Sequence, residues 1–187
     1  FDAIFPDFGI TTKFVDVRDP KGFEKAITAK TKLIYVETIG NPALDVADIP
    51  AIAAVAKKHN LPLVVDGTFT TPYLLKTIEL GANVVINSLT KWLGGHGGAI
   101  GGVVTDGGNF DWSDPKFELF TQPDRNFHGL RWALDLPPER RRLAFALRFR
   151  MVPLRNIGAC LAPDNAWLFL QGLETLHLRM PRHCENA

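Results

Sequence analysis

The sequence lacks the features that direct a chain to a membrane, a disulfide framework or a nucleic acid. Its two cysteines, Cys160 and Cys184, have neither metal-motif nor disulfide-framework spacing. No stretch approaches the roughly 18 consecutive apolar residues of a membrane span, and the N-terminus carries no basic segment before an apolar one. Lys and Arg total 21 against 20 Asp and Glu, so no excess charge favours nucleic acid or an anionic membrane. We therefore expect an unsecreted, cytoplasmic protein that binds a small molecule, without nucleic acid, membrane or metal.

The sequence does have enough apolar residues for one substantial core. At 187 residues and 46% hydrophobic content, it can bury about two-thirds of its unfolded surface. Short apolar runs alternate with helical patterns, which predicts an α/β fold with a mostly parallel sheet flanked by helices. We expect strands at 14–17, 32–36, 61–66, 83–87 and 99–105, helices at 19–29, 48–60, 72–80, 140–160 and from 164, and an irregular aromatic segment at 107–138.

Polar residues follow three of the expected strands. Glu37, Asp66 and the run Ser88 to Lys91 stand where strands end. Because ligands of such sheets bind outside the carboxyl ends of the strands, we expect these residues at one site.

The spacing of Asp66 and Lys91 indicates a pyridoxal 5'-phosphate site. That cofactor needs a Lys to form a Schiff base, an acid beside its ring nitrogen, and hydrogen-bond donors for its phosphate. Lys91 supplies the amine, Asp66 the acid, and Ser88 and Thr90 two hydroxyls that project to one side of an extended chain. The apolar flanks of Lys91 predict a desolvated and therefore nucleophilic amine.

Structural roles compete with each of these assignments. Asp66 before Gly67 also fits a turn, the two hydroxyls fit a helix cap, and most lysines are solvated. The glycines from Gly94 to Gly98 are better explained as turns than as a ligand loop, and His96 among them has no partner at metal-ligand spacing.

Four segments resemble one family in order and spacing. They are Glu37-Thr38-Ile39-Gly40-Asn41-Pro42, Asp66-Gly67-Thr68-Phe69-Thr70-Thr71-Pro72-Tyr73, Ser88-Leu89-Thr90-Lys91-Trp92-Leu93-Gly94-Gly95-His96-Gly97 and Gln171-Gly172-Leu173-Glu174-Thr175-Leu176. They resemble the Cys/Met-metabolism pyridoxal-phosphate enzymes over essentially the whole chain. The resemblance implies the large domain of the aspartate-aminotransferase type (fold type I), in a homotetramer built as a dimer of dimers.

The resemblance also implies individual roles. Lys91 would be the catalytic Schiff-base lysine, Asp66 the partner of the pyridine nitrogen, and Ser88 and Thr90 phosphate ligands. Asn41 would contact the phenolic oxygen of the cofactor, Thr68 would lie against its ring, and Glu37 would support the site.

The implied reaction is a gamma-replacement in methionine biosynthesis, in which O-acetylhomoserine and sulfide give homocysteine and acetate. The alternative within the family is a relative that acts on cystathionine or methionine, with cystathionine gamma-synthase or gamma-lyase type activity on the same cofactor. The alternative outside catalysis is a truncated, non-catalytic fragment. The family's phosphate loop, stacking aromatic residue and carboxylate-binding arginine do not occur in this sequence, so we expect part of a longer polypeptide. Residues 1–160 would belong to the cofactor-binding domain, and 161–187 would begin the connection to a C-terminal domain.

Two residues depart from the family pattern. Gly67 stands where many relatives have Asn, and Pro181, which commonly is Glu, is expected to kink or end its helix.

Overall fold

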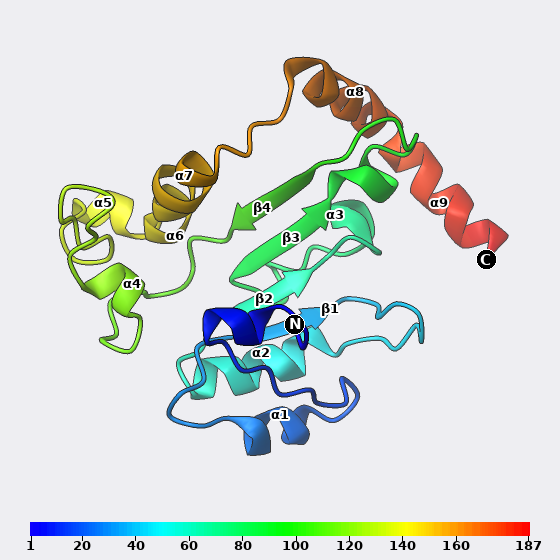
Figure 1. Cartoon of the computed structure of the whole chain (residues 1–187). Coiled ribbons are helices and arrows are strands. Elements are labelled where there is room, and N and C mark those ends of the chain that lie inside the picture. The colour runs from blue at the N-terminus through cyan, green and yellow to red at the C-terminus, as the bar shows by residue number, and fades with distance from the viewer.

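A computed structural model describes all 187 residues as an α/β fold around one four-stranded sheet (Figure 1). The strands are β1 (Ile34–Glu37), β2 (Leu63–Asp66), β3 (Val84–Ser88) and β4 (Gly102–Asp106), and they lie in that order. The first three strands pair in parallel, whereas β4 runs antiparallel to β3 at the edge of the sheet. The expected mostly parallel sheet is confirmed, with β4 as the exception.

Helices and single turns connect the strands and follow them. They are η1 (Phe5–Phe8), α1 (Pro20–Ala26), α2 (Ile49–Lys58), α3 (Thr71–Leu74), η2 (Leu89–Leu93), α4 (Glu118–Thr121), α5 (Pro138–Arg141), α6 (Ala144–Phe149), η3 (Arg150–Leu154), α7 (Arg155–Ile157), α8 (Pro163–Glu174) and α9 (Leu176–Asn186). None of them combines the length and the apolar character that crossing a membrane requires.

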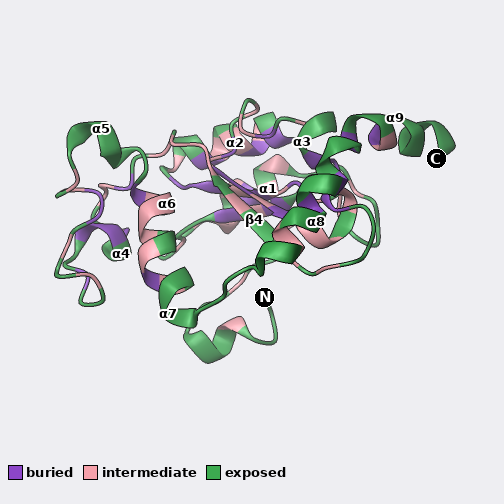
Figure 2. Ribbon diagram, turned by 90° about the horizontal axis from the view of Figure 1, so that it is seen from above, coloured by how far each residue is buried: buried purple, intermediate pink, exposed green.

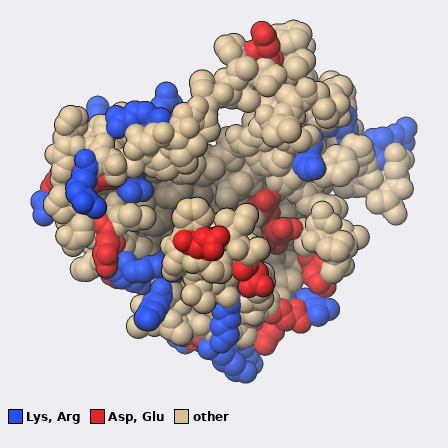
Figure 3. All heavy atoms as spheres, in the orientation of Figure 1, with Lys and Arg blue, Asp and Glu red and all other residues tan.

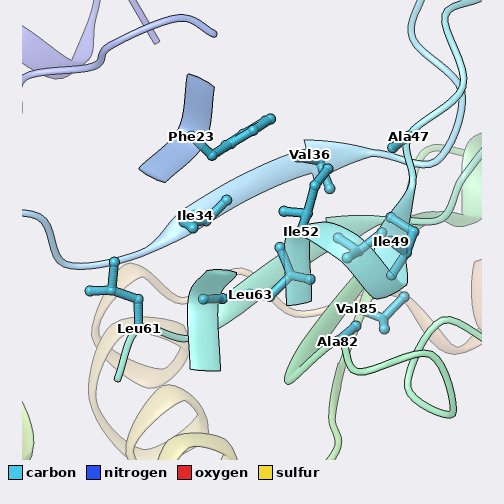
Figure 4. Packing of buried hydrophobic residues seen from close by; sticks show 12 residues of the cluster. Phe23, Ile34, Val36, Ala47, Ile49, Ile52, Leu61, Leu63, Ala82 and Val85 are labelled. Carbon is cyan, nitrogen blue, oxygen red and sulfur yellow. The ribbon is translucent and has the colours of Figure 1, made fainter. Parts of the chain in front are cut away.

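Helix α2 shows how the sequence builds the first core. The carboxylate of Asp48 accepts a hydrogen bond from the Ala51 N–H at 3.0 Å, which caps the helix that the sequence predicts at 48–60. Ile49, Ile52 and Ala56 recur at helical spacing and are buried in the first core. Figure 4 shows Ile49 and Ile52 beside the sheet. Burial of each large aliphatic side chain contributes about 1.5–3 kcal/mol, so this face holds α2 in place.

The opposite face of the sheet is covered by the irregular aromatic segment. Val84 of β3 belongs to a second buried cluster with Trp112, Phe120 and Trp132. The rings of Trp112 and Phe120 stack with centroids 4.4 Å apart. Figure 2 shows the resulting buried strands between more exposed helices, with α9 extending away from them. The prediction of an irregular segment with short helical pieces at 107–138 is therefore confirmed.

A buried carboxylate ties this aromatic segment to α6. Asp124 accepts hydrogen bonds from the Trp132 Nε1 at 2.9 Å and from the Asn126 N–H at 2.9 Å. Its Oδ2 also lies 3.3 Å from the Nε of Arg148, and the two side chains are only 5% and 15% exposed. Burial by itself raises the pKa of Asp124, but the bonds from Trp132 and Asn126 and the Arg148 charge outweigh it, so the pKa is lowered.

Four expectations about secondary structure are wrong in part or in full. Residues 14–17 form no strand, because the segment packs Val15 and Val17 on the first core without joining the ladder. The helix expected at 72–80 is the single turn α3, and the helix expected at 140–160 is divided into α5, α6, η3 and α7.

The fourth expectation, that Pro181 kinks or ends its helix, is wrong in part. Helix α9 continues through this residue to Asn186 and does not end there, while a kink stays a prediction. Pro181 lacks the N–H that would donate to the carbonyl of His177 four residues earlier, so the helix loses that internal hydrogen bond.

The charged side chains are mixed on the face seen in Figure 3. Lysine and arginine gather over the region of α5 to α7, whereas acidic side chains stand nearer the middle of this face. Arg140, Arg141 and Arg142, in and directly after α5, are exposed.

Candidate cofactor site

The register of the sheet brings the strand ends together. Glu37 pairs with Asp66 across β1 and β2, and Asp66 pairs with Ile86 across β2 and β3. Ser88 ends β3 two residues further on. The arrows of β1, β2 and β3 point to the same side in Figure 1, so their polar last residues share one edge of the sheet.

A cavity of about 550 Å³ lies at this edge. Its lining includes six of the seven residues that the sequence assigns to the site: Glu37, Asn41, Asp66, Thr68, Ser88 and Lys91. The volume lies within the range of roughly 300–1,000 Å³ typical of small-molecule sites.

Asp66 is held in a fixed orientation by two donors. Its Oδ1 accepts the N–H of Thr68 at 2.8 Å, and its Oδ2 faces the hydroxyl of Tyr35 at 3.4 Å. Burial raises the pKa of Tyr35, and the nearby carboxylates Asp66 and Glu37 raise it further. The Tyr35 hydroxyl therefore stays protonated and can donate to Asp66. The turn role of Asp66 and its place in the cavity are both observed.

Tyr35 supports Asp66 from outside the cavity lining, and no expectation from the sequence named it. It lies on β1 two residues before Glu37, and its hydroxyl reaches across to β2. A signal was present, because alternation along the strand places residues 35 and 37 on the same face.

Two further contacts join neighbouring parts of the site. The Thr68 hydroxyl accepts the N–H of Ser88 at 2.8 Å, which links the ends of β2 and β3. The carboxylate of Glu37 accepts the N–H of Asn41 at 3.3 Å, which fixes the loop after β1.

Thr90 is the predicted site residue that does not line the cavity. The strand ends at Ser88, and Thr90 lies in the helical turn η2, so the two hydroxyls do not share one side of an extended chain as expected. The Thr90 Oγ1 instead donates to the Gly101 carbonyl at 3.3 Å and accepts the Gly101 N–H at 3.1 Å. It closes the base of the loop that follows Lys91.

Lys91 lines the cavity, but its side chain is exposed rather than desolvated. The backbone departs from helical geometry at this residue, with φ −91° and ψ −128°. Of its apolar neighbours, Leu93 is buried against Leu176 and Met180, whereas Trp92 lines the cavity with Lys91. The expectation of burial at Lys91 is wrong.

The glycines after Lys91 turn the chain. Gly95 and Gly97 have φ of +72° and +63°, values that favour glycine, and both also line the cavity. His96 lies close to the Gly94 carbonyl oxygen, with its Nδ1 at 2.8 Å. The interpretation of these glycines as turns is confirmed, and the turn forms one wall of the site.

The donor set fits pyridoxal phosphate. The cavity combines one amine, one carboxylate whose orientation is fixed, and two hydroxyls at neighbouring strand ends, which are the groups this cofactor requires. A second hollow, of about 600 Å³, contains Trp112, Arg141 and Arg142 but no lysine beside a strand-end carboxylate.

Comparisons with known proteins point to the same chemistry. A family profile described as Cys/Met metabolism PLP-dependent enzyme matches residues 1–187. The O-acetyl-L-homoserine sulfhydrylase of Leptospira meyeri is 49% identical over 98% of this chain, and the homocysteine/cysteine synthase of Saccharomyces cerevisiae is 43% identical over all of it.

A solved structure agrees in its fold. The putative O-acetylhomoserine (thiol)-lyase of Campylobacter jejuni superposes with a TM-score of 0.90 at 38% identity over the whole chain, and it contains N'-pyridoxyl-lysine-5'-monophosphate. The chain spans 42% of the length of each of the two relatives and 45% of the solved structure.

Proposed function

This chain belongs to the Cys/Met-metabolism PLP-dependent enzymes, and on that premise we propose that it forms the cofactor-holding part of an O-acetylhomoserine sulfhydrylase. The observation that carries the proposal is the single cavity that contains Glu37, Asp66 and Ser88 at the ends of three adjacent strands, with Lys91 in the turn after the third. The proposed reaction converts O-acetylhomoserine and sulfide into homocysteine and acetate, a step of methionine biosynthesis.

Lys91 and Asp66 would carry the central chemistry. When bound, pyridoxal phosphate supplies an aldehyde that takes up an amino group and a ring that accepts the electrons of a broken bond. The Nζ of Lys91 would hold the cofactor covalently and, once displaced, would move protons at the alpha and beta carbons of the substrate. The carboxylate of Asp66 would keep a proton on the ring nitrogen, and Tyr35 and Thr68 would keep that carboxylate oriented.

The remaining residues would bind and orient. We propose the hydroxyl of Ser88 as a phosphate ligand, Asn41 as a contact for the phenolic oxygen and Thr68 as a neighbour of the ring. Glu37 would support the site by holding the backbone of Asn41. Thr90 would serve as a second phosphate ligand only if its hydroxyl left Gly101.

Borohydride labelling tests where the cofactor attaches. The chain is incubated with pyridoxal phosphate, reduced and digested, and we expect the pyridoxyl group predominantly on Lys91. Lys76, which is exposed and pairs with Glu79 at 3.4 Å, is the internal control. Lys91→Ala should lose the label while keeping its circular dichroism, because an exposed amine rarely stabilises a core. Equal labelling of Lys76 and Lys91 would remove the proposal.

Turnover tests separate the proposed activity from its alternatives. Release of acetate from O-acetylhomoserine with sulfide would support the sulfhydrylase, whereas release of cysteine from cystathionine would support the other branch. Selective labelling of Lys91 without turnover of either substrate would support the non-catalytic alternative for this chain.

The proposal also covers how the chain assembles, where it is located in the cell and where its domains begin and end. We propose a homotetramer built from dimers and a cytoplasmic location, which fits the two free, exposed thiols of Cys160 and Cys184. Residues 1–160 would form the cofactor-binding part, and 161–187 would begin a connection to a second domain. Sedimentation of the chain and of the longer relatives would test the assembly.

A further inference from the structure

Outside the cavity lining, the guanidinium of Arg179 contacts the backbone directly after Lys91. Arg179 of α9 donates from Nη1 to the Trp92 carbonyl at 2.8 Å and from Nη2 to the Leu93 carbonyl at 3.4 Å. These carbonyls end the turn η2, where helical carbonyls lack partners within the helix. A fixed cation is well suited to that position.

The same guanidinium also joins the two C-terminal helices. Its Nη2 donates to the Gly172 carbonyl of α8 at 2.7 Å, and its Nε donates to the Thr175 hydroxyl at 3.0 Å between α8 and α9. Arg179 therefore connects η2, α8 and α9 through four hydrogen bonds. Capping the end of α8 would require only the bond to Gly172, so the two bonds to the carbonyls of residues 92 and 93 indicate a second role for Arg179.

The packing around Arg179 leaves the backbone of residues 91–95 little freedom to move. A Cβ at Gly95 would lie 2.5 Å from the Arg179 Nη1, so the guanidinium rests directly on this glycine. The Gly95 N–H in turn donates to the carbonyl of Lys91 at 2.8 Å. Every carbonyl from Lys91 to Leu93 is thus held by Arg179 or by a glycine that Arg179 contacts.

Apolar contacts position α8 and α9 so that Arg179 can reach the turn. Leu93 of η2 is buried with Leu176 and Met180 of α9. Phe169 of α8 fits against the loop, because a Cβ at Gly94 would lie 2.9 Å from its ring. In Figure 1, α8 and α9 lie beside the end of β3 that leads into η2, which agrees with these contacts.

We propose that Arg179 is a positioning residue for Lys91, which fixes the turn that presents the Lys91 amine to the cavity. The inference rests on the proposed function in that Lys91 is the attachment residue. Arg179 itself does not line the cavity, and it acts through the backbone of residues 91–95. Residues 161–187 would then complete the site as well as lead away from it.

The test compares Arg179→Met and Arg179→Lys with Arg182→Met. Arg182 is an exposed arginine of the same helix that bonds only to Glu185, so its loss controls for a change of charge on α9. All variants are kept well below their unfolding temperatures, and hydrogen exchange is followed in the segment 89–98. In parallel, the share of borohydride-fixed pyridoxyl on Lys91 is measured against that on Lys76.

We expect Arg179→Met to speed amide exchange at Gly94 and Gly95 by about tenfold or more, since it loses several charge-assisted hydrogen bonds. The share of label on Lys91 should fall in the same variant. Arg179→Lys should restore part of both signals because an ammonium can still reach one or two of the carbonyls. A purely structural role would lower the melting temperature without this rescue at Lys91.

The two hypotheses fail in different ways. If the unaltered chain shows no preference for Lys91, the proposed function fails, and the exchange measurement alone decides whether Arg179 holds the turn. If exchange and the Lys91 share in both Arg179 variants match those of Arg182→Met, the positioning role is overturned. Arg179→Lys keeps the test valid should Arg179→Met fail to fold.

Discussion

Replacing Asp124 by Asn should destabilise the chain far more than any surface carboxylate would. The substitution preserves the shape of the side chain but removes the charge that compensates Arg148, whose side chain is 15% exposed. Removing one partner of a buried ion pair costs about 3–5 kcal/mol, because the other charge stays buried and unpaired. Since Arg148 keeps some access to water, we expect a loss near the lower limit, about 3 kcal/mol.

Urea unfolding at pH 7 followed by tryptophan fluorescence and by circular dichroism measures this loss. For a chain of this size, about 3 kcal/mol corresponds to a fall in melting temperature of roughly 6–12 °C. Asp135→Asn is the matched control, because Asp135 also pairs with an arginine, Arg131, but on the surface. We expect no measurable change from that control.

A second substitution tests the cause of the loss. If the unpaired charge of Arg148 is responsible, then Asp124→Asn combined with Arg148→Met should lose less stability than the sum of the single variants. A loss below about 1 kcal/mol in Asp124→Asn, or strict additivity in the double variant, would refute the reasoning.

The pH dependence of this stabilisation has a defined sign. The folded pKa of Asp124 is lowered from its ordinary value of 3.8. Its contribution is therefore present above about pH 4 and is lost as the pH falls through the folded pKa. The difference in stability between the unaltered chain and Asp124→Asn should shrink over that range.

Two further predictions concern the site and its support. Asp66→Asn should keep Lys91 labelling yet lower turnover, in this chain or in a longer form that contains it, because an amide cannot hold the ring proton; release of the cofactor or unchanged turnover would make Asp66 a turn residue only. Gly172→Ala should destabilise the chain by about 1–3 kcal/mol, because the new Cβ would lie 2.1 Å from the Gly94 carbonyl oxygen. Gly98→Ala, with nothing within 4 Å of its Cβ, is the control in the same denaturant titration, and equal midpoints would contradict the close contact.

The site was largely predictable because its residues follow local rules. Asp66 stands directly after one apolar run and Ser88 stands one residue beyond another, and the carboxyl ends of parallel strands share an edge, so the sequence alone brings them together. The capped helix α2 was equally local, since Asp48 and the apolar spacing after it determine its start and buried face.

Other features depended on contacts between distant residues. Val15 and Val17 have strand character, but whether they join a sheet depends on a partner strand that the local pattern does not specify. The exposure of Lys91 depends on the backbone kink within η2, which apolar neighbours do not reveal. Arg179 lies 87 residues from Trp92 in the sequence, and no sequence motif predicts the contact between them.

The antiparallel return of β4 has a consequence for chain topology. Ser88 and Gly102 are paired, and Leu89 donates to the Gly101 carbonyl at 2.9 Å, so the segment between them is a closed loop with adjacent ends. Lys91 lies close to the end of this loop that follows β3, whereas the exposed Gly98 lies nearer the end that leads into β4. Extra residues inserted after Gly98 would lengthen the loop at a small entropic cost without moving its base. The loop can therefore vary in length, or receive an inserted peptide, while Lys91 keeps its position after the end of β3.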